Sequence, residues 1–159
     1  MKLLVDIQTA SSEPLPAEED IRKWIDAALT GRTTQKQVEV SIRLVDQDEM
    51  AQLNETYRGK KGTTNVLTFP ANLPTELDIP LLGDIVICAP VVGAEAAQQG
   101  KTSNAHWAHM TVHGALHLLG YDHIEEEDAT IMEALESSIL MDLNYACPYN
   151  LTQPCEHLL

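Results

Sequence analysis

Long apolar runs, leader-like features and paired cysteines are all missing from this 159-residue sequence. No stretch of about 18 apolar residues occurs, so no segment is long enough to cross a membrane as a helix. The first residues carry an acid at the sixth position and no small-residue cleavage site, so we expect no signal peptide. The three cysteines include no close pair of the C-x-x-C kind. We therefore expect a cytoplasmic protein with no membrane partner and no cysteine-held metal.

Positive charge is also scarce. Ten Lys and Arg against 24 Asp and Glu give a net charge of −14, and no Lys or Arg lies between Thr102 and the C-terminus. Proteins that bind nucleic acid normally present a basic face. The composition therefore disfavours sequence-independent coating of duplex DNA, and we expect no DNA partner. Solubility explains the acidity in the simplest way, but the cluster of Arg58, Lys60 and Lys61 leaves room for a small phosphate-binding site.

The length of 159 residues and the lack of a long linker indicate one domain over residues 1–159. The fractions of hydrophobic (44%) and charged (21%) residues are those of an ordinary globular protein. Strands come early and helices late. We therefore predict an α+β fold, in which a single mixed β-sheet is covered by helices. Asp46, with Glu49 three residues later, is typical of a capping box at the start of the second helix. The predicted strands cover 2–8, 38–44, 65–69 and 81–88, and the predicted helices cover 16–31, 46–57, 90–99, 102–119 and 125–143.

Five of the six histidines lie between positions 106 and 123. In a helix, His113 and His117 lie about 40° apart on one face, which suits two imidazoles on one metal. Gly120 lets the chain leave the helix, and His123 returns as a third ligand. Three neutral nitrogens leave the fourth position of a zinc ion for water, as in catalytic sites. We predict one zinc ion per chain in the segment of about 103–123, bound by His113, His117 and His123.

Surface histidines with no shared role are the alternative explanation, which would be preferred for any single histidine. Three histidines at this spacing, with glycine at the turn, favour the metal. His106 and His109 fall on nearly the same face, one to two turns earlier. We expect these two to support the ligands or to lie on the surface, because three ligands already fill the site.

The spacing H-x-x-x-H-x-x-G-x-x-H matches the zinc-binding frame of the metzincin peptidases except at one position. Where that frame has the glutamate that acts as general base, this chain has Gly114. Glycine cannot take a proton, so a peptidase would need an acid from elsewhere, with Asp84 and Asp122 as candidates. We therefore disfavour a zinc peptidase, although we expect similar metal geometry.

A glycine-rich basic turn follows the predicted helix at 46–57 and leads into a short strand. Arg58 offers a planar fork of five donors suited to phosphate oxygens, and Lys60 and Lys61 offer point charges. Basic residues are common at helix ends because cations suit the C-terminal end of the helix dipole. Taken alone, the turn is therefore a weak indication of a phosphate site.

With two further segments, this turn resembles the YbeY family of metal-dependent endoribonucleases, bacterial proteins of ribosomal RNA maturation. The matching pieces follow the family's order over about residues 38–145. Thr63 departs from the family pattern, which more often has proline there. The three pieces are Tyr57-Arg58-Gly59-Lys60 to Phe69, Leu82-Gly83-Asp84-Ile85 with Ile87, and the histidine motif ending Gly120-Tyr121-Asp122-His123.

The resemblance implies a mixed sheet, a zinc on a central metal-binding helix and single-stranded RNA as the substrate. It implies His113, His117 and His123 as the ligands and Arg58 as the catalytic arginine. From the basic turn itself, we predict that Arg58, Lys60 and Lys61 bind the substrate. The implied function is a zinc-dependent, single-strand-specific endoribonuclease in ribosomal RNA processing, namely maturation of the small-subunit 3′ end, and in ribosome quality control. Its partners would be ribosomal RNA and the ribosome or small-subunit assembly proteins. The predicted C-terminal tail, about 145–159, carries no catalytic motif.

A different class of function stays open: a non-catalytic adaptor for RNA or ribosomal proteins that contains a structural zinc. The missing general base and the thin basic surface favour this alternative. Against it, a closed structural zinc site takes four protein ligands. This segment has only three histidines with the spacing of zinc ligands, unless His109 is a fourth ligand.

Overall fold

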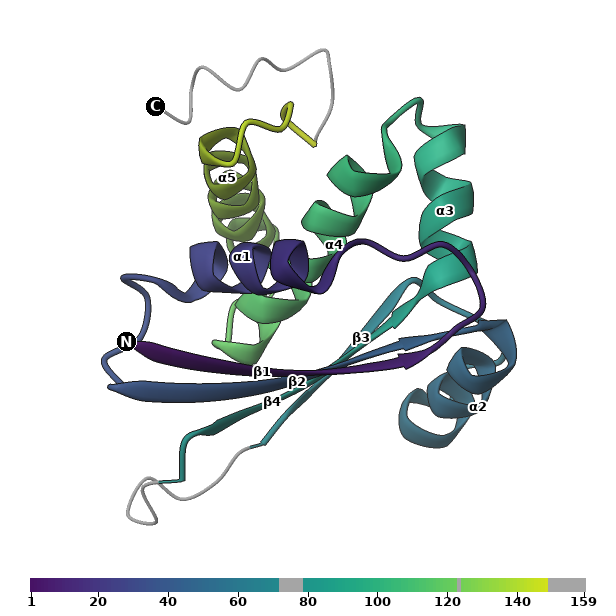
Figure 1. Ribbon diagram of the computed structural model, residues 1–159, viewed down its shortest axis with the longest axis horizontal. Helices are drawn as coiled ribbons and strands as arrows, with labels where there is room; N and C mark the ends of the chain where they lie inside the picture. The colour runs from purple at the N-terminus through teal and green to yellow at the C-terminus, as the bar shows by residue number, and fades with distance from the viewer. Residues whose placement is uncertain (72–78, 123, 149–159) are drawn as a thin grey trace.

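Figure 1 shows the computed structural model of the protein, which describes residues 1–71, 79–122 and 124–148. All the predicted strands and helices are present, with ends within two residues of the predicted ones. Position 123 and most of the predicted C-terminal tail (149–159) lie outside the described residues. The strands are β1 (Lys2–Ala10), β2 (Gln37–Val45), β3 (Val66–Pro70) and β4 (Leu81–Cys88); the helices are α1 (Glu18–Leu29), α2 (Gln47–Arg58), α3 (Ala89–Gln98), α4 (Ser103–Leu118) and α5 (Glu126–Asp142).

The described strands form one four-stranded sheet in the order β1-β2-β4-β3. Strands β1, β2 and β4 run parallel, whereas β3 runs antiparallel to β4. The sheet is therefore mixed, and the predicted α+β class is confirmed. Strand β3 lies at an edge, where Pro70 is tolerated at its end because an edge strand leaves part of its backbone unpaired. This edge position later brings β3 to the candidate site.

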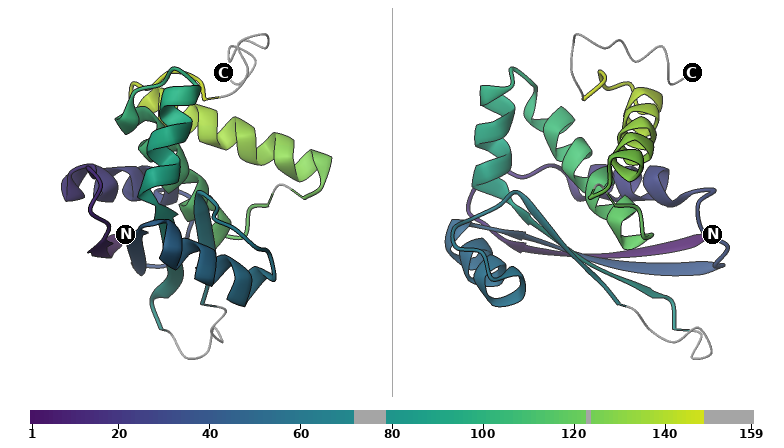
Figure 2. Two further views of the ribbon diagram at one scale, coloured as in Figure 1. Left: turned by 90° about the vertical axis from the view of Figure 1, so that its right-hand side faces the viewer. Right: turned by 180° about the vertical axis from the view of Figure 1, so that it is seen from behind.

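The helices divide between the two faces of the sheet. Helices α1, α4 and α5 lie over one face, and α2 lies against the other, as the views in Figures 1 and 2 agree. The larger hydrophobic core fills the space beneath α1, α4 and α5. Most side chains of α4 are buried, which explains why this helix has no simple polar face. The smaller core lies under α2 and consists of Val45, Met50, Leu67, Val86 and Cys88.

The predicted capping box at the start of α2 is wrong in its contacts. Asp46 does occupy the N-cap position, but its side chain makes no cap hydrogen bond and instead accepts one from the Ser11 hydroxyl. Glu49 takes two hydrogen bonds from Arg43, at 2.5 and 3.0 Å. This bidentate charged contact lowers the pKa of Glu49. The guanidinium is a stronger partner than the backbone amide that a capping box would offer.

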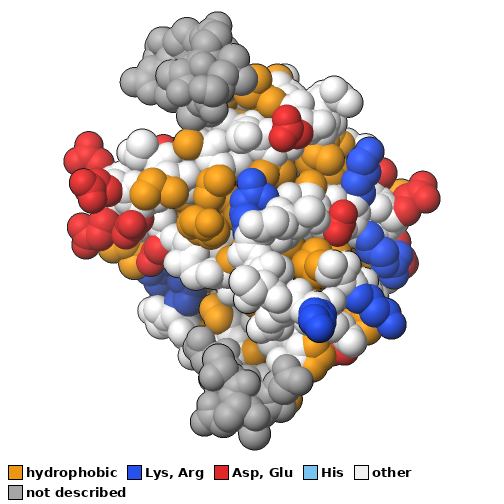
Figure 3. All heavy atoms as spheres, turned by 90° about the vertical axis from the view of Figure 1, so that its left-hand side faces the viewer, with side chains coloured by type: hydrophobic (Ala, Val, Ile, Leu, Met, Phe, Trp, Pro, Cys, Tyr) orange, Lys and Arg blue, Asp and Glu red, His pale blue; other side chains and the backbone are white. Residues whose placement is uncertain are grey.

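One face of the molecule shows how the charge is arranged. Among the described side chains in Figure 3, one group of acidic side chains lies at the left margin, while most of the Lys and Arg side chains lie on the right, interspersed with further acidic ones. This face therefore presents no continuous basic surface for a nucleic-acid backbone. Within residues 1–71, 79–122 and 124–148, no helix combines the length and the apolar character needed to span a membrane.

Gly114 allows α4 to approach the sheet closely. A Cβ at this position would lie 2.9 Å from the Cγ2 atom of Ile85 in β4. Ile85 is fully buried, so it can give way only by shifting within the packed core. The residue that replaces the metzincin glutamate is therefore one with no side chain, because the sheet occupies the space that a side chain would need.

Gly114→Ala is expected to lower the free energy of unfolding by about 1–3 kcal/mol, because the added methyl group overpacks the layer between α4 and β4. Gly93→Ala is the matched control, since Gly93 is an exposed glycine of α3 with open space around an added Cβ. Alanine at position 93 should raise stability by up to about 1 kcal/mol through helix propensity. Urea unfolding measures both effects. A Gly114→Ala protein as stable as the Gly93→Ala protein would contradict the packing argument.

Candidate active site

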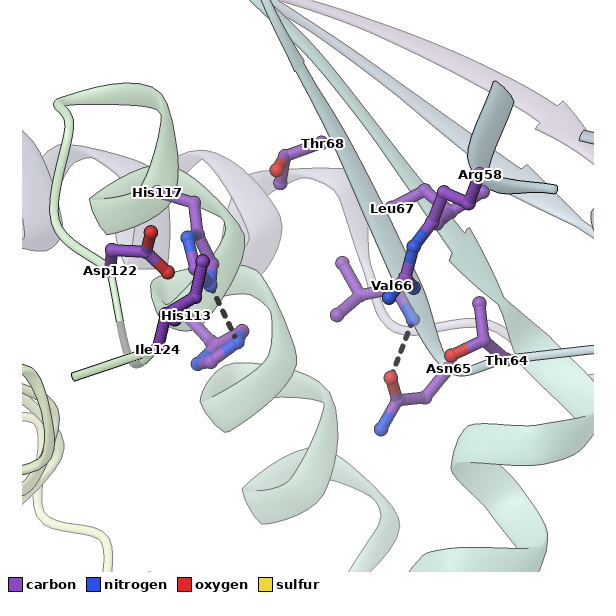
Figure 4. A pocket seen from close by; sticks show the side chains of 10 residues that line it. All are labelled: Arg58, Thr64, Asn65, Val66, Leu67, Thr68, His113, His117, Asp122 and Ile124. Atoms are coloured by element: carbon purple, nitrogen blue, oxygen red, sulfur yellow. Dashed lines mark hydrogen bonds between the residues drawn. The ribbon is translucent and has the colours of Figure 1, made fainter. Parts of the chain in front are cut away.

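A cavity of about 460 Å³ lies between the start of β3 and the C-terminal half of α4. Its volume falls in the range of small-molecule sites, roughly 300–1,000 Å³. Figure 4 shows its two walls, one carrying Arg58 and the other carrying His113 and His117. The residues that line it are Arg58, Thr64, Asn65, Val66, Leu67, Thr68, His113, His117, Asp122 and Ile124.

The two histidines of α4 point toward each other across one helical turn. Their Nε2 atoms are 3.1 Å apart, and both side chains are half-buried. Two nitrogens on a tetrahedral zinc ion, each at about 2.0–2.1 Å, lie roughly 3.3 Å from one another. The facing nitrogens of His113 and His117 therefore fit two positions on one metal ion.

The third predicted ligand, His123, lies outside the described residues. Its neighbours Asp122 and Ile124 both line the cavity. In the part of the chain that the structure describes, no three His, Cys, Asp or Glu side chains form a group that could hold a metal ion. Of the three predicted ligands, the structure therefore describes the pair His113 and His117.

Arg58 is the last residue of α2, and Gly59 ends the helix in the left-handed conformation, with φ of 66°. The following turn is fixed at two points. The buried Asn54 donates a hydrogen bond of 2.9 Å to the carbonyl of Gly62, and Asn65 caps the start of β3 by accepting from the amide of Val66 at 2.7 Å. This local structure places the arginine on the wall opposite the histidines (Figure 4).

The structure does not bring the other predicted substrate residues into the cavity. Lys60 and Lys61 are exposed and are not among the described residues that line it. Of the two acids considered for a peptidase, Asp122 lines this cavity, whereas Asp84 lines a separate hollow beside Arg43 and Tyr57. Arg58 is therefore the predicted basic residue that shares a cavity with the histidines.

His106 and His109 are both buried, so the surface alternative for them is wrong. His106 contacts Glu95 at 2.9 Å. Burial lowers the pKa of His106, although its hydrogen bond with Glu95 acts in the opposite direction. Glu95 in turn accepts from the Asn65 side chain, at 3.2 and 3.3 Å. This network ties α3 and α4 to the residue that opens β3.

Glu136 of α5 is a further residue beneath the site, and its side chain is fully buried. Its Oε2 atom lies 2.9 Å from Nε2 of His109, and its Oε1 atom lies 2.5 Å from Nδ1 of His113. Burial alone would raise the pKa of Glu136, but the hydrogen bonds from the two histidines outweigh it and lower that pKa to about 2.

Sequence reasoning missed Glu136, Glu95 and Asn65. The sequence did contain one signal for Glu136. It stands in the apolar stripe of α5, at helical spacing from Met132, Ile139 and Leu140, which are all buried. A charged residue within such a stripe is almost never fully buried unless it is paired.

The fold places the chain among α+β proteins with a four-stranded mixed sheet. The solution structure of TM1509 from Thermotoga maritima superimposes with a TM-score of 0.59 at 24% identity, covering 89% of this chain and 92% of that one. The family model described as "Endoribonuclease YbeY" matches residues 6–144. The chain belongs to this family, as its sequence motifs predicted.

Individual members of the family are similar over nearly the whole chain. Endoribonuclease YbeY of Pseudomonas syringae pv. tomato is 53% identical over 156 residues, which cover 98% of this chain and 93% of the relative. Endoribonuclease YbeY of Psychromonas ingrahamii is 50% identical over 153 residues, covering 94% of this chain and 97% of the relative.

Proposed function

We propose that this protein is a zinc-dependent, single-strand-specific endoribonuclease that acts in ribosomal RNA processing. The proposal includes the maturation of the small-subunit RNA 3′ end and ribosome quality control in the cytoplasm, with the ribosome or small-subunit assembly proteins as partners. One observation carries it: in a member of the Endoribonuclease YbeY family, Arg58 and the facing pair His113 and His117 line one cavity.

A single-stranded substrate agrees with the charge of the protein. The net charge is −14, and Arg58 is the one basic residue among the described residues lining the cavity. A duplex would require many phosphate contacts along an extended basic surface. A cavity of about 460 Å³ instead suits one flexible segment of strand, bound at a single phosphate.

The residues that would hold the zinc ion are His113, His117 and His123, with one ion per chain. The chemistry that zinc supplies in such sites is Lewis acidity, which polarises a phosphoryl oxygen or makes water more acidic. The separation of 3.1 Å between the Nε2 atoms of His113 and His117 supports this assignment.

Arg58 binds and orients the phosphate in this proposal. Its planar guanidinium donates two parallel hydrogen bonds to phosphate oxygens, a geometry that a lysine cannot reproduce. As the phosphodiester bond breaks, negative charge grows on those oxygens, and a donor held in place stabilises that charge. Lys60 and Lys61, exposed just after Arg58, would contact neighbouring phosphates along the strand.

His113→Ala and His117→Ala are each expected to abolish stoichiometric zinc binding, because each removes one of three ligands. Elemental analysis of the purified proteins measures the metal. His106→Ala is the control, since it removes a buried histidine of the same helix that contacts Glu95 rather than the cavity. Zinc content equal to that of the parent in either ligand variant would reject the assignment.

Arg58→Lys is expected to reduce kcat/KM for a single-stranded RNA by about 10²–10³-fold, as does the loss of one transition-state donor elsewhere. Lysine keeps the charge but loses the planar fork. Arg22→Lys is the matched control, because Arg22 is an exposed arginine of α1. The assay compares parent and variants at equal zinc content.

Two results would contradict the proposed roles. Parent-level turnover with Arg58→Lys would show that the arginine supplies only charge. A zinc-loaded parent that cleaves neither ribosomal precursors nor model strands would reject the enzyme and favour the adaptor with a structural zinc.

A further inference from the structure

The α4–α5 interface contains a carboxylate that is enclosed by two histidines. Glu136 has 0% of its side chain exposed, and each of its oxygens contacts a different imidazole of α4. Burying a carboxylate is costly unless it is hydrogen-bonded. Its neighbours on the buried face of α5, Met132, Ile139 and Leu140, are apolar. Packing alone would be satisfied by another apolar residue at this position.

We infer that Glu136 is the positioning residue of the metal site, because its carboxylate holds the His113 ring so that Nε2 faces the cavity. This inference rests on the proposed function, in which His113 binds zinc. It adds a residue from α5, outside the histidine motif, to the apparatus that prepares the site.

The hydrogen-bond direction fixes the tautomer of His113. An ionised carboxylate can only accept hydrogen bonds, so the proton shared with Oε1 of Glu136, at 2.5 Å, belongs to Nδ1 of His113. The neutral ring then has its lone pair on Nε2. That atom is the one that faces His117, 3.1 Å away. The carboxylate therefore selects the tautomer in which His113 can bind a metal.

His109 holds the other end of the carboxylate. Its Nε2 atom contacts Oε2 of Glu136 at 2.9 Å, one helical turn before His113. Because each oxygen has its own histidine, the carboxylate cannot rotate without breaking one of the two contacts. His109 thus acts on the metal site through Glu136.

Other metal sites indicate how much zinc affinity should fall when Glu136 is replaced. Ligating histidines commonly donate their second ring N–H to a carboxylate, and removal of that partner typically weakens metal affinity by about 10–100-fold. Such a partner raises the basicity of the ligand and restricts its orientation. Glu136 has the same relation to His113.

The experiment measures zinc affinity by competition with a chelator, in the full-length protein. Glu136→Leu removes both acceptors and is expected to weaken zinc binding toward the upper end of the 10–100-fold range, to about 100-fold. Glu136→Gln keeps an acceptor for His113 and is expected to lose less, about 10-fold. Nitrogen-15 NMR of the zinc-free proteins should report the Nδ1–H tautomer of His113 in the parent and a mixture of tautomers in Glu136→Leu.

Two controls separate positioning from general effects. Glu133→Gln removes the same charge from an exposed position of the same helix, and Glu95→Gln alters the similar carboxylate contact to His106, a histidine that does not line the cavity. Both should bind zinc as the parent does. Unfolding of the zinc-free proteins is followed in parallel, and Glu136→Gln carries the test if Glu136→Leu does not fold.

The outcomes distinguish this inference from the function on which it rests. A parent that binds no zinc rejects the metal site and the positioning role together. A parent that binds zinc, with a folded Glu136→Gln or Glu136→Leu protein that binds it equally well and keeps the His113 tautomer, overturns the positioning role alone. Graded loss of affinity, in the order parent, Gln, Leu, without matching loss in the controls, supports it.

Discussion

The close packing of α4 on β4 is the contact on which the arrangement of the site depends. Gly114 lies against Ile85, so the helix axis approaches the sheet more closely than a side chain would allow. With α4 held this close to the sheet, the side chains of His113 and His117 line the same cavity as β3. Strand β3 is hydrogen-bonded to β4, and the chain enters it from Arg58. One helix–sheet contact therefore sets the position of the histidines relative to the arginine.

The same contact explains how this chain departs from the zinc peptidases whose histidine spacing it shares. In the metzincin frame, the residue after the first histidine is a glutamate that acts as general base. Here that position faces the sheet, and the carboxylate associated with the histidines comes instead from α5. Glu136 reaches the buried Nδ1 side of His113 rather than the cavity. A carboxylate on that side orients the ring but does not reach a substrate, so similar spacing supports a different division of roles.

The sequence predicted what local periodicity determines. The alternation of apolar and polar residues predicted β2, in which Val38, Val40, Ile42 and Leu44 are buried. The spacing of His113 and His117 predicted that their side chains face each other. The resemblance to the family supplied the pairing of these histidines with Arg58. Contacts between distant segments were not predictable in this way. Glu136 lies 23 residues from His113, and Glu95 lies 30 residues from Asn65. Only the folded chain shows these partners, because it places α5 beside α4 and α3 beside the start of β3. The capping-box prediction for Asp46 and Glu49 was wrong for the same reason. In the folded chain, Asp46 pairs with Ser11 and Glu49 pairs with Arg43, and neither contact can be read from local spacing.

Because positive charge is scarce in this chain, Arg58 is important for attracting RNA in the proposed function. In a chain with 14 more acids than bases, an RNA strand is repelled by much of the surface, and the repulsion decreases over about 8–10 Å at physiological salt. Attraction must therefore come from charge concentrated at the site: the Arg58 guanidinium, the nearby lysines and, in the proposed enzyme, the zinc ion. Such a distribution contributes little to affinity for long or double-stranded nucleic acid, where many phosphates must be neutralised. In the proposed enzyme, it contributes most at one phosphate bound in the cavity. The acidity that at first argues against a nucleic-acid enzyme is thus consistent with one that acts on a single exposed strand.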